Sequence, residues 1–459
     1  MAVSVAVYLS LVLAADPAAM APPYAPPAAW ADSSDGVHLF LTFDSRCSNE
    51  SIASNPHAVK LDYVWGASAH HIPSYRSSTN PDTVLSSYIP CCRDEEAKYL
   101  DGMAEYKRKG WGDRILYQCD RATPAWTHYV GESFNETALI PVDFSNPVVV
   151  DWQIETYVKS AAAKGFDAIA WDNFCLSNEY RACGIWNKAG KWVQLYKNET
   201  DDPAFAEAAV TWLAAVKQKV NAITTQRGKR MLVIPNYSLD GLWNDSLTFR
   251  VGNATDGVLA ESGFTGGGPR KDKPYDYVGD QWVQRVKFMR NLQAHGKAAY
   301  YINEYGDVHN PSKWKEPCSE DPLNCIQKPV RQWVLGSYLM GKEQAAALYL
   351  SKVQGYGNWS YYPEWSAPVG KSLGAPVEHA SGLWSRLFSG AFVLVNPSNV
   401  TIDATVPAGK WQDLYGKQVS STLAMAPVTA ATLVRANFTR AEKGAAFKKK
   451  TIIKTDSLL

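Results

Sequence analysis

The chain has 459 residues, a length that favours a large barrel domain of about 250 residues or more together with a smaller companion domain. Its 46 Lys and Arg residues nearly balance its 45 Asp and Glu residues, so the formal net charge is only +1. This balance creates no broad field that would attract a polyanion, and we therefore expect no nucleic-acid partner. The 17 Trp and 24 Tyr residues suit either sugar binding or the packing of a large barrel.

The amino terminus has the composition of a secretory signal peptide. Residues 2–15 are apolar apart from two serines and one tyrosine, and this stretch is too short to span a bilayer. We expect a signal peptide over residues 1–21, and a disordered tail is the alternative. Nine Asn-X-Ser/Thr sequons point to the same secreted, extracellular and N-glycosylated state. They begin at Asn49, Asn135, Asn198, Asn236, Asn244, Asn253, Asn358, Asn399 and Asn437.

Short apolar runs alternate with amphipathic stretches over residues 36–360, a pattern typical of βα units around a parallel sheet. There are eight such runs, so the fold class expected is α/β, a (β/α)8 TIM barrel. The expected strands are residues 37–43, 59–65, 114–119, 166–171, 231–235, 257–260, 298–303 and 346–350.

Two of the intervening helices have clear starts. Asn146-Pro147 and Asp202-Pro203 each place a capping side chain directly before a proline, which is well tolerated in a first helical turn. Apolar residues then recur at helical spacing, as in Phe205, Ala209 and Trp212. We interpret these stripes as packing surfaces.

After a Pro- and Gly-rich stretch, residues 380–437 return to short alternating runs, which predict a small antiparallel, sandwich-like β domain. Residues 438–459 are polar and include the basic run 448–450, so we expect a solvated tail. No segment after the amino terminus is apolar for long enough to predict a membrane anchor. The sequence does not define an oligomeric state.

The eight cysteines suit disulfide bonds better than zinc, because there is no CxxC pair and no histidine at ligand spacing near them. Cys175–Cys183 and Cys318–Cys325 are spaced to close local loops. The remaining four, which would form two further bridges, are Cys47, Cys91, Cys92 and Cys119.

Carboxylates recur where the expected barrel strands end. Asp44 follows the first strand, Asp120 the third, Asp172 the fourth, Glu261 the sixth and Glu304 the seventh. In a (β/α)8 barrel these strand ends converge on one face, the face that carries active sites. Several acids around one pocket destabilise the fold, because like charges repel and hinder one another's ionisation. Their clustering therefore indicates a functional site.

Two of these acids stand in favourable settings for hydrolysis of a glycosidic bond, a reaction that requires one carboxyl group as proton donor and another as nucleophile or base. Asp172 ends an apolar strand abruptly, and Glu261 precedes a glycine-rich loop at residues 266–268. We therefore predict Asp172 and Glu261 as the catalytic pair. The predicted sugar-binding residues around them are Asp44, Trp65, Asp120, Trp171, Asn173, Asn236, Glu304 and Tyr305. The structural alternatives are that the tryptophans fill the barrel and that Asn236 carries a glycan.

Five short stretches carry a resemblance to a known family: PVDFSNP (141–147), GFDAIAWDN (165–173), DGVLAESG (256–263), LVNPS (394–398) and DLYG (413–416). Over residues 36–435 the chain resembles glycoside hydrolase-like barrels distantly related to the alpha-galactosidase and endo-polygalactosaminidase superfamily. This resemblance implies that Asp172 is the nucleophile and Glu261 the proton donor. A glutamate at the sixth strand and the lack of a lysine pattern beside Asp172 depart from the alpha-galactosidase pattern, so a preference for galactose does not carry over.

Other chemistries lack their motifs here. The sequence contains no GxSxG, GxxxxGK[ST] or HExxH, and His70-His71 alone does not make a metal site. Two carboxylates and water complete the expected reaction without a cofactor or a metal. The alternative function is a noncatalytic, secreted carbohydrate-binding or cell-wall protein on the same scaffold.

Overall fold

The structure, a computed structural model, describes residues 36–125, 139–237, 246–261, 263–266, 275–306, 326–352, 355–357 and 361–436. The predicted signal peptide (1–21) and polar tail (438–459) lie outside the described residues.

Eight parallel strands form the central sheet, in the order β10-β11-β12-β1-β2-β3-β6-β9. Parallel hydrogen-bonded backbone between β9 and β10 closes this sheet into a barrel: Asn236 pairs with Leu259, and the amide of Tyr237 donates to the carbonyl of Leu259 at 2.8 Å. The predicted (β/α)8 barrel is thus confirmed. The strands are β1 (Leu39–Thr42), β2 (Leu61–Trp65), β3 (Val84–Pro90), β6 (Ala168–Asp172), β9 (Leu232–Pro235), β10 (Gly257–Ala260), β11 (Ala298–Glu304) and β12 (Ala346–Ser351).

The third strand is where the sequence-based prediction was wrong. Residues 114–119, expected to form it, lie outside the barrel sheet, and β3 takes its place. The run from Val84 to Pro90 contains Ser86 and Ser87, so it does not look like a buried strand. Ser86 is nevertheless fully buried, because its hydroxyl has two partners inside the protein. It donates to the carbonyl of Val64 at 2.9 Å and accepts a hydrogen bond from the hydroxyl of Tyr63 at 3.0 Å.

Aromatic side chains fill the barrel interior. The ring of Tyr63 stacks on that of Tyr300 with centroids 4.3 Å apart, and Phe40 lies 5.4 Å from Tyr300. These three residues come from β2, β11 and β1, so the barrel is packed across its axis and is not a pore.

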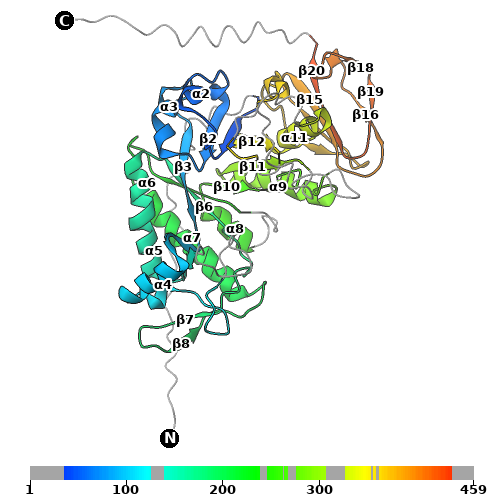
Figure 1. Cartoon of the computed structure of the whole chain (residues 1–459). Helices are drawn as coiled ribbons and strands as arrows, with labels where there is room; N and C mark the ends of the chain where they lie inside the picture. Colours follow the sequence, from blue (N-terminus) through cyan, green and yellow to red (C-terminus); the bar gives the residue numbers. More distant parts are fainter. Residues whose placement is uncertain are drawn as a thin grey trace, which may run out of the picture.

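Helices cover the outside of the barrel (Figure 1). The two predicted helix starts are confirmed: Asn146 accepts a hydrogen bond from the amide of Val148 and Asp202 from that of Ala204. The α-helices are α2 (Asn49–Ala53), α3 (Ile72–Ser77), α4 (Tyr99–Arg108), α5 (Pro147–Gln153), α6 (Lys159–Lys164), α7 (Pro203–Asn221), α8 (Ser246–Asn253), α9 (Asp280–Ala294) and α11 (Lys328–Gly341); a π-helical turn, Ile154–Val158, joins α5 to α6.

The carboxyl-terminal region forms the predicted antiparallel β domain, which consists of a six-stranded sheet and a two-stranded sheet. It packs on α11 so closely that a Cβ atom added to Gly336 would lie 2.6 Å from that of Ala430. Its strands are β13 (Val377–Glu378), β14 (Trp384–Leu387), β15 (Ala391–Asn396), β16 (Ile402–Thr405), β17 (Trp411–Gln412), β18 (Gln418–Val419), β19 (Thr422–Met425) and β20 (Thr429–Arg435).

Two long excursions leave the barrel after β3 and after β6, at the carboxyl ends of these strands. The first contains β4 (Arg93–Lys98), α4 and β5 (Leu139–Pro141), and the second contains the hairpin β7 (Gly184–Trp186) and β8 (Trp192–Gln194). The Cys119–Cys183 disulfide joins the two excursions, so the predicted Cys175–Cys183 pairing was wrong. Figure 1 shows this part projecting away from the barrel on the side opposite the carboxyl-terminal domain.

Candidate active site

Asp172 is the last residue of β6 and only 5% of it is exposed. The hydroxyl of Tyr88 on β3 donates to its Oδ2 at 2.7 Å, and Nδ2 of Asn236, directly after β9, donates to its Oδ1 at 2.9 Å. Both neighbouring strands therefore supply a neutral donor to this carboxylate. Hydrogen bonds of this kind stabilise the charged form of a buried acid and fix its orientation.

Polar atoms next to this carboxylate have no partner among the described residues. Oδ1 of Asn236, whose Nδ2 binds Asp172, and Nδ2 of the next residue, Asn173, are buried and make no hydrogen bond there. Asn173 has a φ of 57°, in the left-handed region that a non-glycine residue rarely adopts. The end of β6 thus combines an oriented acid with unsatisfied donors and acceptors, which is typical of a site that binds a polar ligand.

Glu261 directly follows β10, and its Oε1 accepts a hydrogen bond of 3.0 Å from the hydroxyl of Tyr356. Glu304, the last residue of β11, also interacts with that hydroxyl. Burial and the two neighbouring glutamates raise the pKa of Tyr356 well above its ordinary value, so the phenol keeps its proton. Two carboxyl groups therefore meet at one protonated tyrosine.

A continuous row of aromatic rings connects Asp172 with Glu261. The ring of Tyr88, which binds Asp172, lies 5.5 Å from that of Phe43, and Phe43 lies 5.9 Å from Tyr356, which binds Glu261. In the barrel order, only β9 separates β6 from β10. The two predicted catalytic acids therefore occupy the same rim, at the carboxyl ends of the strands.

Asp44 lies after β1, as predicted, but it is fully buried. Its Oδ1 accepts from the amide and the hydroxyl of Ser68, at 2.9 and 2.5 Å, and its Oδ2 lies 3.0 Å from Nδ1 of His71. Both carboxylate oxygens are thus engaged inside the protein. We leave Asp44 out of the proposed sugar-binding set.

The two predicted tryptophans are also buried. Trp65 is 2% exposed, and Trp171 is 0% exposed with its ring packed edge-on against Trp212 of α7 at 5.2 Å. Neither offers a ring face to a sugar, so both side chains pack the barrel, as the structural alternative expected. Tyr305 differs, because it is partly exposed and contacts the ring of Tyr275 at 5.9 Å.

Asp120 is exposed and belongs to the excursion after β3, not to the end of a barrel strand. Its carboxylate accepts hydrogen bonds from the hydroxyl of Thr123 and from the amides of Ala122 and Thr123, which together lower its pKa. This is a local turn, and it explains the position of Asp120 without a ligand.

Tyr88 and Tyr356, the residues that bind the two acids, were not among the predicted site residues. Tyr88 lies on the strand that was not recognised, and Tyr356 lies in an irregular segment after β12. A position two residues before the end of a recognised β3 would have been the signal available for Tyr88.

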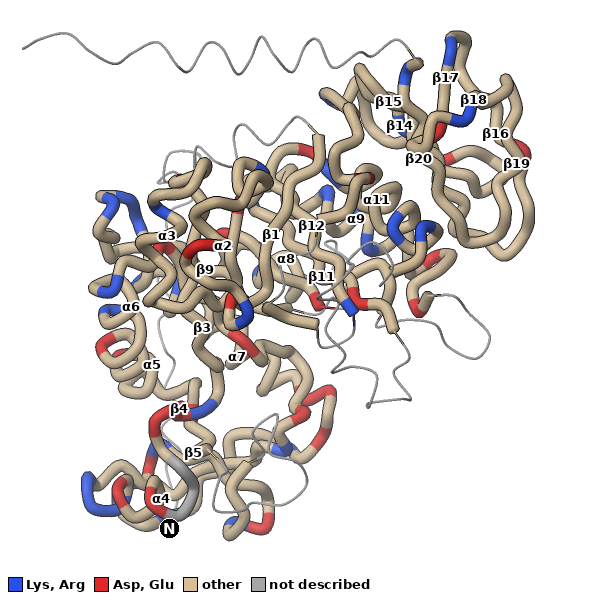
Figure 2. The backbone as a smooth tube through the Cα atoms, turned by 45° about the horizontal axis from the view of Figure 1, so that its top comes forward, with Lys and Arg blue, Asp and Glu red and all other residues tan. Residues whose placement is uncertain are grey.

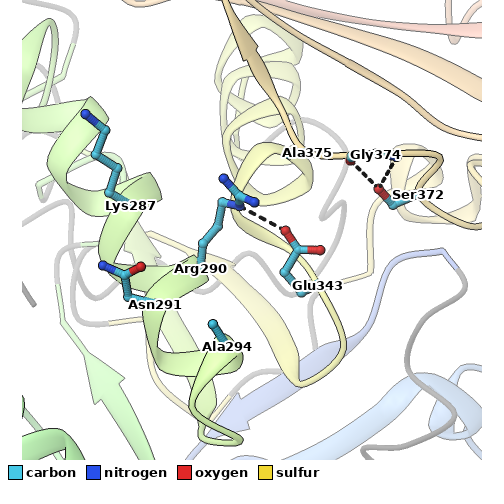
Figure 3. A pocket seen from close by; sticks show the side chains of 8 residues that line it. All are labelled: Lys287, Arg290, Asn291, Ala294, Glu343, Ser372, Gly374 and Ala375. Atoms are coloured by element: carbon cyan, nitrogen blue, oxygen red, sulfur yellow. Dashed lines mark hydrogen bonds and ion pairs between the residues drawn. The ribbon is translucent and has the colours of Figure 1, made fainter.

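A cavity lies at the opposite, amino-terminal ends of the barrel strands. This cavity of about 610 Å³ opens beside α9 and the start of β12, where Arg290 binds Glu343 at 2.9 Å (Figure 3). Glu343 is also bound by the buried Arg386 at 2.8 Å. The pair between Arg386 and Glu343 joins the carboxyl-terminal domain to the barrel, which gives these charges a structural role.

Comparison with known proteins does not assign a family. No family model matches the chain, and no curated protein matches it. Solved structures with some similarity include the alpha-glucosyl transfer enzyme XgtA, with 10% identity, a TM-score of 0.46, and coverage of 90% of this chain and 100% of that one. A GH31 family sulfoquinovosidase from E. rectale has 11% identity and a TM-score of 0.47, with coverage of 92% of this chain and 65% of that one. An Anoxybacillus alpha-amylase has 9% identity and a TM-score of 0.45, with coverage of 88% of this chain and 98% of that one. Similarities this weak leave the resemblance to the alpha-galactosidase superfamily a prediction.

Within the described part of the chain, no helix is long and apolar enough to cross a membrane, and no group of three or more His, Cys, Asp or Glu side chains is placed to hold a metal ion. Figure 2 shows Lys and Arg interspersed with Asp and Glu along the described chain.

Proposed function

We propose that the protein is a glycoside hydrolase that cleaves O-glycosidic bonds of an oligo- or polysaccharide with Asp172 and Glu261. The observation that carries this proposal is the setting of Asp172, a buried carboxylate at the carboxyl end of a barrel strand whose two oxygens each accept one neutral hydrogen bond. An acid held this way has a fixed orientation, as the nucleophile or base of a glycosidase must have.

Glu261 is proposed as the proton donor. The phenol of Tyr356 has one proton, so it donates to only one of Glu261 and Glu304 at a time. Two adjacent carboxylate anions repel each other, and a proton held by the pair relieves this repulsion. Such a pair can deliver a proton to the leaving oxygen of a sugar while Asp172 attacks the anomeric carbon or activates water.

The proposed sugar-binding residues are those with accessible or unsatisfied polar groups at this rim. Asn173 and Asn236 have unpaired amide atoms, while Glu304 and the partly exposed Tyr305 follow one another at the end of β11. Amide and carboxylate groups of this type bind sugar hydroxyls, and a partly exposed aromatic ring can cover the apolar face of a sugar.

The proposal is tested by screening the protein against polysaccharides and aryl glycosides, beside the variants Asp172→Asn and Glu261→Gln. Turnover by the wild type that is lost in both variants supports a glycosidase with this pair. Absence of turnover on every sugar contradicts it. Sugar binding without turnover would instead support the noncatalytic carbohydrate-binding function, which the low exposure of Asp172 also suits.

We further propose that the protein is secreted and N-glycosylated. Four sequon asparagines, Asn49, Asn198, Asn253 and Asn399, are exposed and thus accessible to a glycan. Asn236 is 8% exposed and bound to Asp172, which disfavours it as an acceptor. Enzymatic removal of N-glycans from protein produced in a secreting eukaryotic host should lower its mass, and an unchanged mass contradicts the proposal.

A further inference from the structure

Cys91 and Cys92 form a disulfide between neighbouring residues directly after β3. The pairing of β3 with β6 ends at Pro90 and Asp172, and the amide of Cys91 makes the next hydrogen bond, to the carbonyl of Asp172 at 2.9 Å. The disulfide therefore begins at the residue that holds the backbone of the proposed nucleophile.

The sulfur atom also contacts the residue after Asp172. Sγ of Cys91 lies 3.1 Å from the carbonyl oxygen of Asn173, the residue with the left-handed backbone. The hydroxyl of Tyr180 donates to the same oxygen at 2.5 Å. Cys91 thus binds the turn at the end of β6 through its amide, and its disulfide sulfur, which has no proton to donate, packs against the turn.

Cys91 is itself anchored from the helical side of the barrel. Nε2 of Gln153, which is 0% exposed, donates to the carbonyl of Cys91 at 2.8 Å, and Oε1 of Gln153 accepts from Nε1 of Trp212 at 3.0 Å. The amide of Val142 donates to the carbonyl of Cys92 at 3.0 Å. The two cysteines therefore connect α5, α7 and the first excursion to the end of β6.

We propose that the Cys91–Cys92 disulfide is a positioning element of the active site, which holds the Asp172–Asn173 backbone so that Asp172 faces the substrate. The small ring that it closes restricts both side chains and the peptide between them. Reduction by a dithiol breaks the S–S bond with two electrons and two protons, leaves two thiols and converts the dithiol to a disulfide. The side chains of Cys91 and Cys92 can then rotate independently, which removes the restraint on the Cys91 backbone amide that binds the carbonyl of Asp172. The expected effect on kcat rests on the proposed function. The expected effect on the backbone at Asp172 and Asn173 does not.

The test compares wild type, the double variant Cys91→Ala/Cys92→Ala and the control Cys119→Ala/Cys183→Ala, which loses the other described disulfide. Peptide mass mapping first establishes whether the oxidised wild type contains the Cys91–Cys92 bond, and its absence overturns the proposal. Hydrogen exchange is then measured on peptides covering residues 88–93 and 170–175. We expect about tenfold faster exchange of both peptides in the first variant and little change at 170–175 in the control. Unchanged exchange of these peptides in the first variant overturns the proposal.

The kinetic arm uses whichever sugar substrate the wild type hydrolyses. We expect kcat of the Cys91→Ala/Cys92→Ala variant to fall about 10- to 100-fold with KM within about twofold, because misplacement of a catalytic group reduces turnover more than ground-state binding. An unchanged kcat overturns the positioning role. Should the variant fail to fold, the wild type is reduced with dithiothreitol under native conditions, and the same exchange and kinetics are measured. If the wild type hydrolyses nothing, the proposed function fails, and the exchange result alone decides the positioning role.

Discussion

The hydroxyl of Tyr88 on β3 donates a hydrogen bond of 2.7 Å to Oδ2 of Asp172 on β6. Tyr88→Phe removes this donor and leaves the ring in place, so Asp172 loses orientation without a cavity being created. We expect kcat/KM to fall about tenfold, the usual effect of losing one hydrogen bond to a charged group. Steady-state kinetics on the substrate found in the screen measure this change.

A matched control is Tyr301→Phe, which removes another hydroxyl from a barrel strand. Its hydroxyl donates to the carbonyl of Arg285 at 3.0 Å and contacts no site residue. We expect a similar loss of stability in both variants but a kinetic effect for Tyr88→Phe alone. An equal loss of kcat/KM in the two variants would refute the positioning of Asp172 by Tyr88.

The hydroxyl of Tyr356 donates to Oε1 of Glu261 at 3.0 Å and orients this carboxyl group. Tyr356→Phe removes this donor and leaves the ring in place. We expect kcat/KM to fall about tenfold, the usual effect of losing one hydrogen bond to a carboxyl group. Steady-state kinetics measure this change, and an unchanged kcat/KM would argue that Tyr356 does not position Glu261.

Lys297 lies at the amino end of β11, where its Nζ donates to the carbonyl of Thr255 at 2.8 Å. Burial, followed by repulsion from Lys217, lowers the pKa of Lys297 from 10.5 to about 7. Between these two values the unfolded state binds a proton that the folded state does not, so stability rises with pH across that window. Below pH 7 both states are protonated, and the cost of burying the ammonium group is complete.

Lys297→Met removes the free-energy cost of burying the ammonium group of Lys297. The carbonyl of Thr255 keeps a donor, because Lys217 donates to it at 2.8 Å. Relative to wild type, we expect the variant to gain most stability below pH 7 and to lose this advantage as the pH approaches 10.5. Urea unfolding at several pH values measures the difference. For the control Lys287→Met, at an exposed position, we expect a stability difference from wild type that does not change with pH. The same pH-independent difference for Lys297→Met would contradict the lowered pKa of Lys297.

Arg386 on β14 joins the β domain to the barrel. Its side chain is 0% exposed and donates to Glu343 at 2.8 Å and to the carbonyl of Leu339 at 2.9 Å. Arg386→Met leaves the buried carbonyl of Leu339 without this donor, while Glu343 keeps Arg290, so we expect a loss of about 1–3 kcal/mol in the free energy of unfolding. Urea denaturation measures this loss. As a control, Lys410→Met at an exposed position should change the free energy of unfolding by less than about 0.5 kcal/mol. Equal stabilities for the two variants would contradict the structural role of Arg386.

The barrel could be predicted because seven of its strands are short, largely apolar runs, as in residues 166–171. The third strand escaped prediction because Ser86 satisfies its hydroxyl within the sheet, a contact that no local pattern reveals. Asp44 illustrates the same limit at the site. Its position at a strand end was correct, but Ser68 and His71, which occupy its oxygens, belong to the loop after β2.

Disulfide pairing depended on how the two excursions fold together. Cys119 and Cys183 lie 64 residues apart in sequence, and their Cα atoms are 5.0 Å apart only because Tyr117 pairs with Gly184. Residue spacing carries no information on that contact. By contrast, the positions of Asp172 and Glu261 on one rim followed from strand ends alone, because the barrel brings all such ends to one face.

The most direct test of the account is the rate of glycoside hydrolysis by wild type, Asp172→Asn and Glu261→Gln on the best substrate of the sugar panel. We predict measurable turnover by the wild type and a loss of about 100-fold or more in each variant, with folding retained by circular dichroism. Hydrolysis that persists at the wild-type rate in either variant, or no hydrolysis of any sugar by the wild type, would contradict the proposed function.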